Sequence, residues 1–520
     1  MTNREFLSRR SFLRRASGAA FGVGAFNTLF DLRLMNSAMA AVNVSDYKAL
    51  VCVFLAGGND CNNTLIPAPA DARYAGYKSI RGPRLALWED QAAAAARPLV
   101  DGNANPNNYW ALPLSTAQTG SDAYAVHSSM TAVRDLFNAG KLAFIPNVGV
   151  MLEPATKAQI LAKQKKLPPQ LFSHNDQVTQ WQTSVPDQIS RTGWGGRTTD
   201  KVREELVRLG IPLGNISLSV SMAGSNTWEV GDTVNQFQVS TNGAVSFKLT
   251  SPTDTGYSLP RKTLIDQILR DTANGGDASL AAARANLHLK DFQQVSERAI
   301  FNGSSLSTAL TRLTSGQPDA SVGLSIDTAF GIGTGGVTYN NLSDLERQLH
   351  TVARIIAERS YLGMQRQIFF VQIGGHDTHG DQPVAHAGLL ATTSRALGKF
   401  SAATEALTVA NKVTSFTASD FGRTFKSNGL GSDHAWASHH MVMGGAVNGS
   451  RLYGTFPTLE LNGPDDYDTG SGATGRWIPT LSADEYSATL ARWFGLDDNA
   501  LSAVFPNLHR FATPNVGFMA

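Results

Sequence analysis

Short apolar runs that end on polar residues are the feature that most limits how this chain can fold. Ile368–Ile373 is the clearest run, and Leu50–Leu55 and residues 413–418 are similar. A continuous apolar run of this length indicates a strand buried on both faces, as in the parallel sheet of an α/β protein. Because ligands bind beyond the carboxyl ends of such strands, the polar residues that follow each run are candidates for a functional site.

Helical patterns alternate with these runs. Ser343-x-x-Glu346 is a capping box that predicts the start of a helix running to Leu362. The pattern also predicts a strand over 142–148 and helices near 128–138 (capped by Ser128 or Ser129), 155–165, 197–208, 261–315, 385–410 and 482–493. Residues 67–125 and 214–260 are predicted to be peripheral insertions, the second β-rich or a small antiparallel sheet. The expected fold is one α/β domain over residues 41–520 with a mostly parallel central sheet.

Histidines are concentrated late in the chain, where six of the 11 lie between His376 and His440. They form two clusters with acidic neighbours: His376, Asp377 and His379 in the first, and Asp420, Asp433, His434, His439 and His440 in the second. Imidazoles and carboxylates gathered after strands are typical of a Zn, Mn or Fe site. His439 and His440 are adjacent and point to opposite faces of an extended chain, so at most one is expected to be a ligand. His376 and His386 are weaker candidates.

The first 40 residues have the features of an export signal. Ser8-Arg9-Arg10-Ser11-Phe12-Leu13-Arg14 matches a twin-arginine motif, and Ala38-Met39-Ala40 is a small-x-small cleavage site. The weakly apolar stretch between them is too short to span a membrane. An ordinary basic N-terminal helix is the alternative interpretation. We expect a signal peptide over residues 1–40, export by the twin-arginine translocase, and a periplasmic or secreted mature protein without a membrane span.

The net charge bears on nucleic-acid binding, and the two cysteines bear on disulfide formation. Removing residues 1–40 takes six arginines and two acids from totals of 44 and 42, which leaves a net charge near −2. No basic patch for nucleic acid is present in the sequence, so nucleic-acid binding is not expected. Cys52 lies inside a predicted strand and Cys61 just beyond it, and a bridge would have to fold back along that strand. We therefore expect no disulfide.

The ordered motifs resemble those of a bacterial secreted family called domain of unknown function 1501. They are GGND at 57–60, SH at 173–174 with WQT at 181–183, GWGGR at 193–197, GGHDTH at 374–379, SDFGRT at 419–424, DHAW at 433–436 and GGAV at 444–447. That family is similar to the alkaline phosphatase and sulfatase superfamily. The resemblance implies an alkaline-phosphatase-like three-layer sandwich with a mostly parallel central sheet and peripheral insertions.

The resemblance also implies a set of metal ligands. Their order along the superfamily chain corresponds to Asp60, Asp377, His379, Asp420, His434 and His440 in this sequence. One or two divalent ions are expected, with Zn, Mn, Fe, Mg and Ca all open. The chain departs from the pattern at three points: Phe421 replaces a histidine ligand, Asp377 and His379 are two residues apart instead of four, and the sulfatase signature Cys-x-Pro-x-Arg is absent.

Ser173 and His174 occupy the position of the superfamily nucleophile, so Ser173, His174 and Arg423 are the catalytic candidates. Ser173 at a helix start could attack an ester, or it could only cap the helix. Arg423 could hold a tetrahedral anion or form a structural ion pair. The leading hypothesis is a metal-dependent hydrolase of small-molecule or polymeric phosphate or sulfate esters, with Ser173 or a metal-bound water as nucleophile. A non-catalytic secreted or cell-surface binding protein is the alternative, and a redox enzyme is less well supported.

Overall fold

The centre of the molecule is an eight-stranded sheet. The computed structural model describes residues 42–96, 109–115, 123–243 and 287–520, so the predicted signal peptide lies outside the described residues. Within them, every strand pairing in this sheet is parallel except those of β10, which runs antiparallel to both of its neighbours. In spatial order the strands are β11 (Leu481–Ser482), β5 (Leu142–Gly149), β10 (Ser438–Met443), β9 (Val413–Ser419), β1 (Lys48–Leu55), β8 (Arg366–Ile373), β6 (Ser219–Ser221) and β7 (Phe237–Gln238). The mostly parallel sheet predicted from the apolar runs is confirmed.

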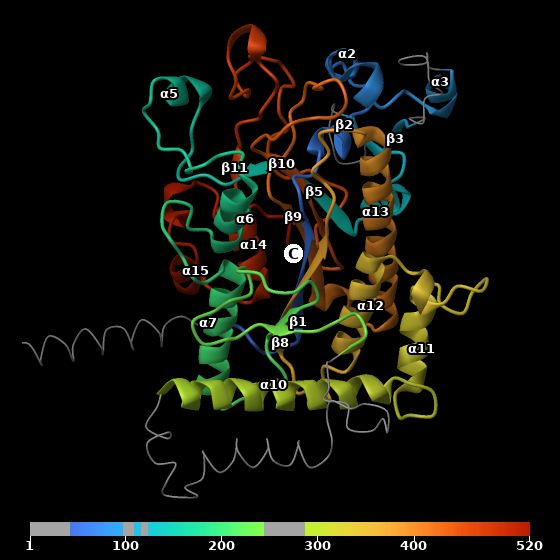
Figure 1. Ribbon diagram of the computed structural model, residues 1–520, viewed down its shortest axis with the longest axis vertical. Helices are drawn as coiled ribbons and strands as arrows, with labels where there is room; N and C mark the ends of the chain where they lie inside the picture. Colours follow the sequence, from blue (N-terminus) through green and yellow to red (C-terminus); the bar gives the residue numbers. More distant parts are fainter. Residues whose placement is uncertain (1–41, 97–108, 116–122, 244–286) are drawn as a thin grey trace, which may run out of the picture.

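Helices cover both faces of the sheet (Figure 1). One group consists of α4 (Thr131–Asn138), α11 (Ala320–Ala329), α12 (Asp344–Ala357) and α13 (Gln382–Ala406). The other consists of α6 (His174–Thr183), α7 (Trp194–Arg208), α14 (Ala483–Phe494) and α15 (Asp498–Val504). Helix α10 (Leu287–Arg312) crosses the amino-terminal end of the central strands, and α5 (Lys157–Leu161) projects near the opposite end (Figure 1). The protein is therefore a mixed α/β fold with helices on either side of one sheet.

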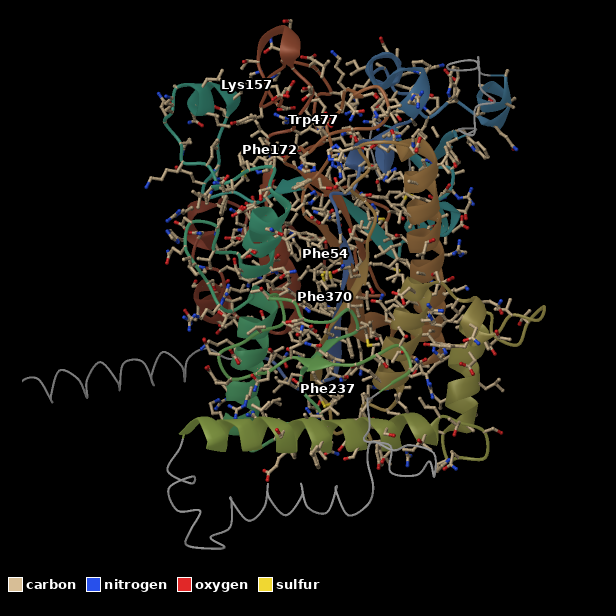
Figure 2. All side chains as sticks on the ribbon, viewed as in Figure 1. Phe54, Lys157, Phe172, Phe237, Phe370 and Trp477 are labelled. Carbon is tan, nitrogen blue, oxygen red and sulfur yellow. The ribbon has the colours of Figure 1, made fainter. Side chains whose placement is uncertain are left out.

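Strand β1 is central because both of its faces are apolar. Ala49 to Leu55 are all buried, and the strand pairs with β8 on one side and β9 on the other. The rings of Phe54 and Phe370, on adjacent strands, stack with centroids 5.8 Å apart inside the core (Figure 2). Burial of a phenylalanine side chain contributes about 1.5–3 kcal/mol, so these runs stabilise the sheet as well as defining it.

The structure describes parts of both predicted insertions. Residues 67–125 contain α2 (Tyr74–Leu85) and α3 (Gln91–Ala95). A second sheet forms within and at the ends of this segment, from β2 (Leu65–Pro67), β4 (Tyr124–His127) and β3 (Ala111–Pro113). In 214–260, the expected antiparallel unit is wrong for the described part, because β6 and β7 add to the main sheet in parallel. These strands have three and two residues, too short to show a period-two pattern.

Several helix ends also differ from expectation. Helix α4 begins after Met130 instead of Ser128 or Ser129, α5 covers only 157–161, and α12 ends at Ala357, short of Leu362. The predicted Ser343–Glu346 capping box is present, with Ser343 Oγ accepting from the Glu346 backbone N–H. Cys52 and Cys61 are free and buried. No helix among the described residues has the length and apolarity needed to cross a membrane.

The ends of β1, β8 and β9 converge because the three strands are in register. Leu55 pairs with Ile373 on one side and with Ser419 on the other. The loop after β1 passes so close to the loop after β8 that a Cβ on Gly57 would lie 2.5 Å from the Asp377 backbone nitrogen. Gly57 also has a φ of 112°, which favours glycine. The sheet thus brings loops 56–60, 374–379 and 420–423 to one edge.

A buried carboxyl group lies next to this edge and gives a prediction about pH. Burial raises the pKa of Glu229 from 4.5 to about 8, despite hydrogen bonds from Asn226 and Gln236 to its Oε2. The folded protein keeps this proton up to about pH 8, whereas the unfolded chain loses it near pH 4.5, so stability falls as pH rises between these values. We expect Glu229→Gln to gain roughly 2–4 kcal/mol relative to the wild type at pH 8 and little at pH 4.5, measured by urea unfolding. Glu204→Gln, on an exposed surface of α7, is the control, and a pH-independent difference would contradict the assignment.

Candidate metal centre

Three imidazole rings and one carboxylate meet at the edge of the sheet. The Nε2 atom of His434 lies 3.1 Å from Nε2 of His174 and 3.0 Å from Nε2 of His379. Asp377 Oδ1 lies 3.6, 3.0 and 3.3 Å from the Nε2 atoms of His174, His379 and His434. Among the described residues, His174, Asp377 and His434 form one group whose ligand atoms are all within 4.8 Å of one another. His379 adjoins this group through His434 and Asp377.

The other ring nitrogen of each histidine faces an oxygen acceptor. Nδ1 of His174 lies 2.7 Å from Asp420 Oδ2, Nδ1 of His379 lies 3.0 Å from Asp433 Oδ1, and Nδ1 of His434 lies 2.8 Å from the Phe172 carbonyl. Because carboxylate and carbonyl oxygens only accept, they place the ring proton on Nδ1. The Nε2 lone pairs of the three rings are then directed at one another and at Asp377.

This arrangement fits a transition-metal ion. Lone pairs and a carboxylate at 3.0–3.6 Å repel one another, and a cation between them would relieve that repulsion. Ligands about 2.0 Å from a tetrahedral zinc ion are about 3.3 Å apart, close to the separations found here. Carboxylates and carbonyls that orient the far nitrogen of a ligating histidine are a regular feature of zinc sites. The nitrogen-rich donor set favours Zn, Fe or Mn over Mg or Ca, which prefer oxygen ligands.

Arg423 holds Asp377 in its ionised form. The Arg423 guanidinium is fully buried and donates to Asp377 Oδ1. Partial burial of Asp377 raises the pKa of its carboxyl group, but the hydrogen bond and charge of Arg423 outweigh this and hold the pKa below its ordinary value. For His434, partial burial lowers the pKa of the imidazole, and the hydrogen bond to the Phe172 carbonyl opposes this shift. The positive charge of Arg423 lowers the pKa further. Both groups are therefore kept in the form that binds a metal.

Phe421 forms the wall beneath two of the rings. Its ring centroid lies 4.7 Å from that of His174 and 4.7 Å from that of His434. Asp420, immediately before it, accepts from the Gly57 backbone N–H at 2.9 Å and faces His174 with its other oxygen. Phe421, which replaces the histidine ligand expected from the resemblance, therefore packs against two rings of the cluster. Asp420 orients His174 and belongs to the surroundings of the cluster.

Besides Asp420, two expected ligands lie outside the cluster. The buried Asp60 carboxylate pairs with Arg81, accepts from Gln382 and caps the turn at Asn62. His440 is buried in β10 and stacks on Tyr486, with ring centroids 5.6 Å apart. Asp60 has an arginine where a metal ligand would have an ion, and His440 points into the core. Neither position supports the ligand role expected from the resemblance.

The remaining polar candidates have structural contacts. His386 is buried, and its Nε2 lies 3.0 Å from Asn59 Oδ1. His376 is also buried, but its two ring nitrogens have no hydrogen-bond partner in the described part of the chain. His439 Nδ1 accepts from the Asn147 backbone N–H at 3.0 Å. Burial raises the pKa of the Cys61 thiol to about 12, which does not suit a thiolate ligand.

The two other catalytic candidates are placed in ways that do not favour direct catalysis. Ser173 precedes α6, as expected of a cap, but its hydroxyl donates to Asp176 Oδ2 at 2.6 Å. Besides Asp377, the Arg423 guanidinium donates to four backbone carbonyls, those of Gly57, Gly58, His376 and Ser432, and its Nη1 lies 3.5 Å from His379 Nε2. Arg423 thus ties three loops together, in keeping with the structural alternative to its anion-binding role.

An open cleft of about 720 Å³ adjoins the cluster. His174, Asp377 and Asp420 line one side, and Asn175, Gln182, Asn226 and Thr227 are among the residues that line the rest. Ser173 does not line it. The cleft gives a ligand access to the same atoms that would hold the metal.

Two contributors were missed by reasoning from the sequence. Asp433 was part of the second cluster but was not expected to orient His379. Phe172 contributes its carbonyl because its backbone is left-handed, with a φ of 73°, and it lies just before α6 (Figure 2). Left-handed phenylalanine has no sequence signal, so this contact could not be predicted.

Comparison with known proteins supports the family resemblance. Residues 230–470 match the model of a family described as "Protein of unknown function (DUF1501)". The matched segment includes Asp377, His379 and His434 and leaves out His174. No curated protein matches the chain.

Proposed function

We propose that this protein is a metal-dependent hydrolase of phosphate or sulfate esters. The observation that carries the proposal is the convergence of the His174, His379 and His434 Nε2 atoms with Asp377 Oδ1 beside an open cleft. A bound transition-metal ion would supply a Lewis acid that stabilises negative charge on the ester. A mostly parallel sheet with its site at the ends of β1, β8 and β9 also supports an alkaline-phosphatase-like fold.

The residues of the chain have distinct roles in this proposal. His174, His379, His434 and Asp377 would hold the metal, and Asp420, Asp433 and the Phe172 carbonyl keep the ring protons on Nδ1. Helix α6 begins at His174, and its first backbone N–H groups lack partners within the helix. Asn175, in this first turn, lines the cleft, so the positive end of the helix dipole favours an anionic ester there.

The proposal is tested by turnover of an aryl sulfate and an aryl phosphate by metal-replete protein from pH 6 to 9. We expect hydrolysis of at least one ester class, and we expect Ser173→Ala to keep most of that activity because its hydroxyl does not line the cleft. Loss of activity in Ser173→Ala with normal metal content would restore Ser173 as the nucleophile. If metal-replete wild type hydrolyses neither ester, the secreted or cell-surface binding protein becomes the better interpretation. The commitment of Arg423 to backbone carbonyls is the observation that favours that alternative.

We further propose export by the twin-arginine translocase to the periplasm or beyond. The support is the motif around Arg9 and Arg10, which lies outside the described residues. Changing both arginines to lysine is expected to leave uncleaved precursor in the cytoplasm, detected by fractionation and immunoblotting. The matched change at Arg4 and Arg33, both outside the motif, is the control. Unchanged accumulation of the mature form outside the cytoplasm would contradict the proposal.

A further inference from the structure

Gln182, at the end of α6, combines burial with an unused hydrogen-bond donor. Its side chain is 5% exposed, yet it lines the cleft. Its Oε1 accepts from the Thr227 backbone N–H at 2.9 Å, which fixes the orientation of the amide. Its Nε2 makes no hydrogen bond to the described part of the chain. This nitrogen is not completely buried, so a ligand can reach it. A fixed donor left without a protein partner at a cleft wall is poised for a ligand acceptor.

The rest of the cleft wall is uncharged and mixes polar side chains with apolar ones such as Phe54 and Val178. Asn175, Thr179, Thr227 and Gln372 line it with amides and hydroxyls. Its charged lining residues are Asp377 and Asp420, and no lysine or arginine is among the lining residues that the structure describes. Away from the metal cluster, the wall therefore offers hydrogen bonds but nothing that would neutralise a second anionic group.

We infer that Gln182 is a specificity-determining residue, which donates from Nε2 to an oxygen of a neutral, hydroxyl-rich group of the substrate, such as a saccharide. This inference rests on the proposed function in one respect: it takes the saccharide to be the group that carries the hydrolysed ester. Amide donors and hydroxyl groups suit sugar oxygens, which both donate and accept. A group with its own negative charge would find no lysine or arginine among the described lining residues of the cleft.

The experiment measures binding of neutral mono- to tetrasaccharides of different sugar composition to the zinc-loaded mature protein by isothermal titration calorimetry. We expect at least one to bind, and the corresponding uronic acid to bind more weakly. Gln182→Glu keeps an oxygen for the Thr227 N–H and removes the donor, so binding should weaken about tenfold. Gln188→Glu, the same change at an exposed position beyond α6, should have no effect.

The outcomes separate this inference from the proposed function. If no saccharide binds, or if Gln182→Glu binds as tightly as the wild type, the inference is overturned even where an aryl ester is hydrolysed. If saccharides bind in the expected way but no ester is hydrolysed, the proposed hydrolase activity fails and the cleft remains a saccharide site. A uronic acid that binds more tightly than its neutral counterpart would overturn the claim that the group is neutral.

Discussion

Replacing His434 by alanine is expected to reduce metal affinity by at least about a hundredfold and to abolish ester turnover. His434 Nε2 lies 3.0–3.3 Å from ligand atoms of His174, His379 and Asp377, so its loss opens the whole cluster. Affinity is measured by competition with a chelator of known metal affinity, followed by elemental analysis. Asp420→Asn and Asp433→Asn, which change only the orienting carboxylates, should each cost about 10–100-fold.

The matched control for His434 is His509→Ala, a change at an exposed histidine on the far C-terminal segment. His509 should have no effect on metal affinity. Equal metal affinity in His434→Ala and the wild type, with both proteins folded, would show that the imidazole cluster is not the metal site.

Breaking the buried Asp60–Arg81 ion pair should produce the largest loss of stability. Both side chains are fully buried, and Arg81 also donates to the carbonyls of Thr424 and Phe425. Arg81→Met would leave the Asp60 carboxylate buried with Gln382 and the Asn62 backbone N–H as its remaining donors, at a cost of about 3–5 kcal/mol. Urea unfolding measures the change. Lys141→Met, which breaks a surface pair with Glu405, should cost less than about 1 kcal/mol.

The same pair distinguishes a structural Asp60 from a ligand. We expect Asp60→Asn to be destabilised but to bind metal with nearly wild-type affinity under conditions where it is folded. The contrary result is a folded Asp60→Asn protein that loses its metal while Arg81→Met keeps it. That result would show that Asp60 is a metal ligand.

The sequence predicted the parts of the fold that depend on local pattern. Strands β1, β8 and β9 were expected to within about two residues because apolar runs buried on both faces are hard to mistake. Strands β6 and β7 were not recognised as parts of the main sheet, because two or three residues are too few to show an alternation of polar and apolar side chains. The second sheet was missed because its short strands lie among proline- and asparagine-rich segments.

The sequence predicted which residues lie at the site better than it predicted what each of them does there. Asp377, His379 and His434 follow the late strands, and their meeting follows from the parallel register. His174 was expected to act in catalysis because it stands with Ser173 in the position of the superfamily nucleophile. Nothing near this helix start indicates that Asp420, 246 residues later, orients its ring. Asp60 was expected to bind metal from its place at the end of the first strand, and its partner Arg81 lies in a segment whose helix was not predicted. Side-chain partners that meet only through the tertiary fold leave no local signal.

The metal content of the mature protein, isolated after export without added metal or chelator, tests the central claim most directly. Inductively coupled plasma mass spectrometry should find about one transition-metal ion per chain, with Zn, Fe or Mn favoured by the three imidazoles. The His434→Ala protein, prepared in parallel, should contain almost none. Wild-type protein that is folded, holds no transition metal and takes up none at micromolar concentration would contradict the account.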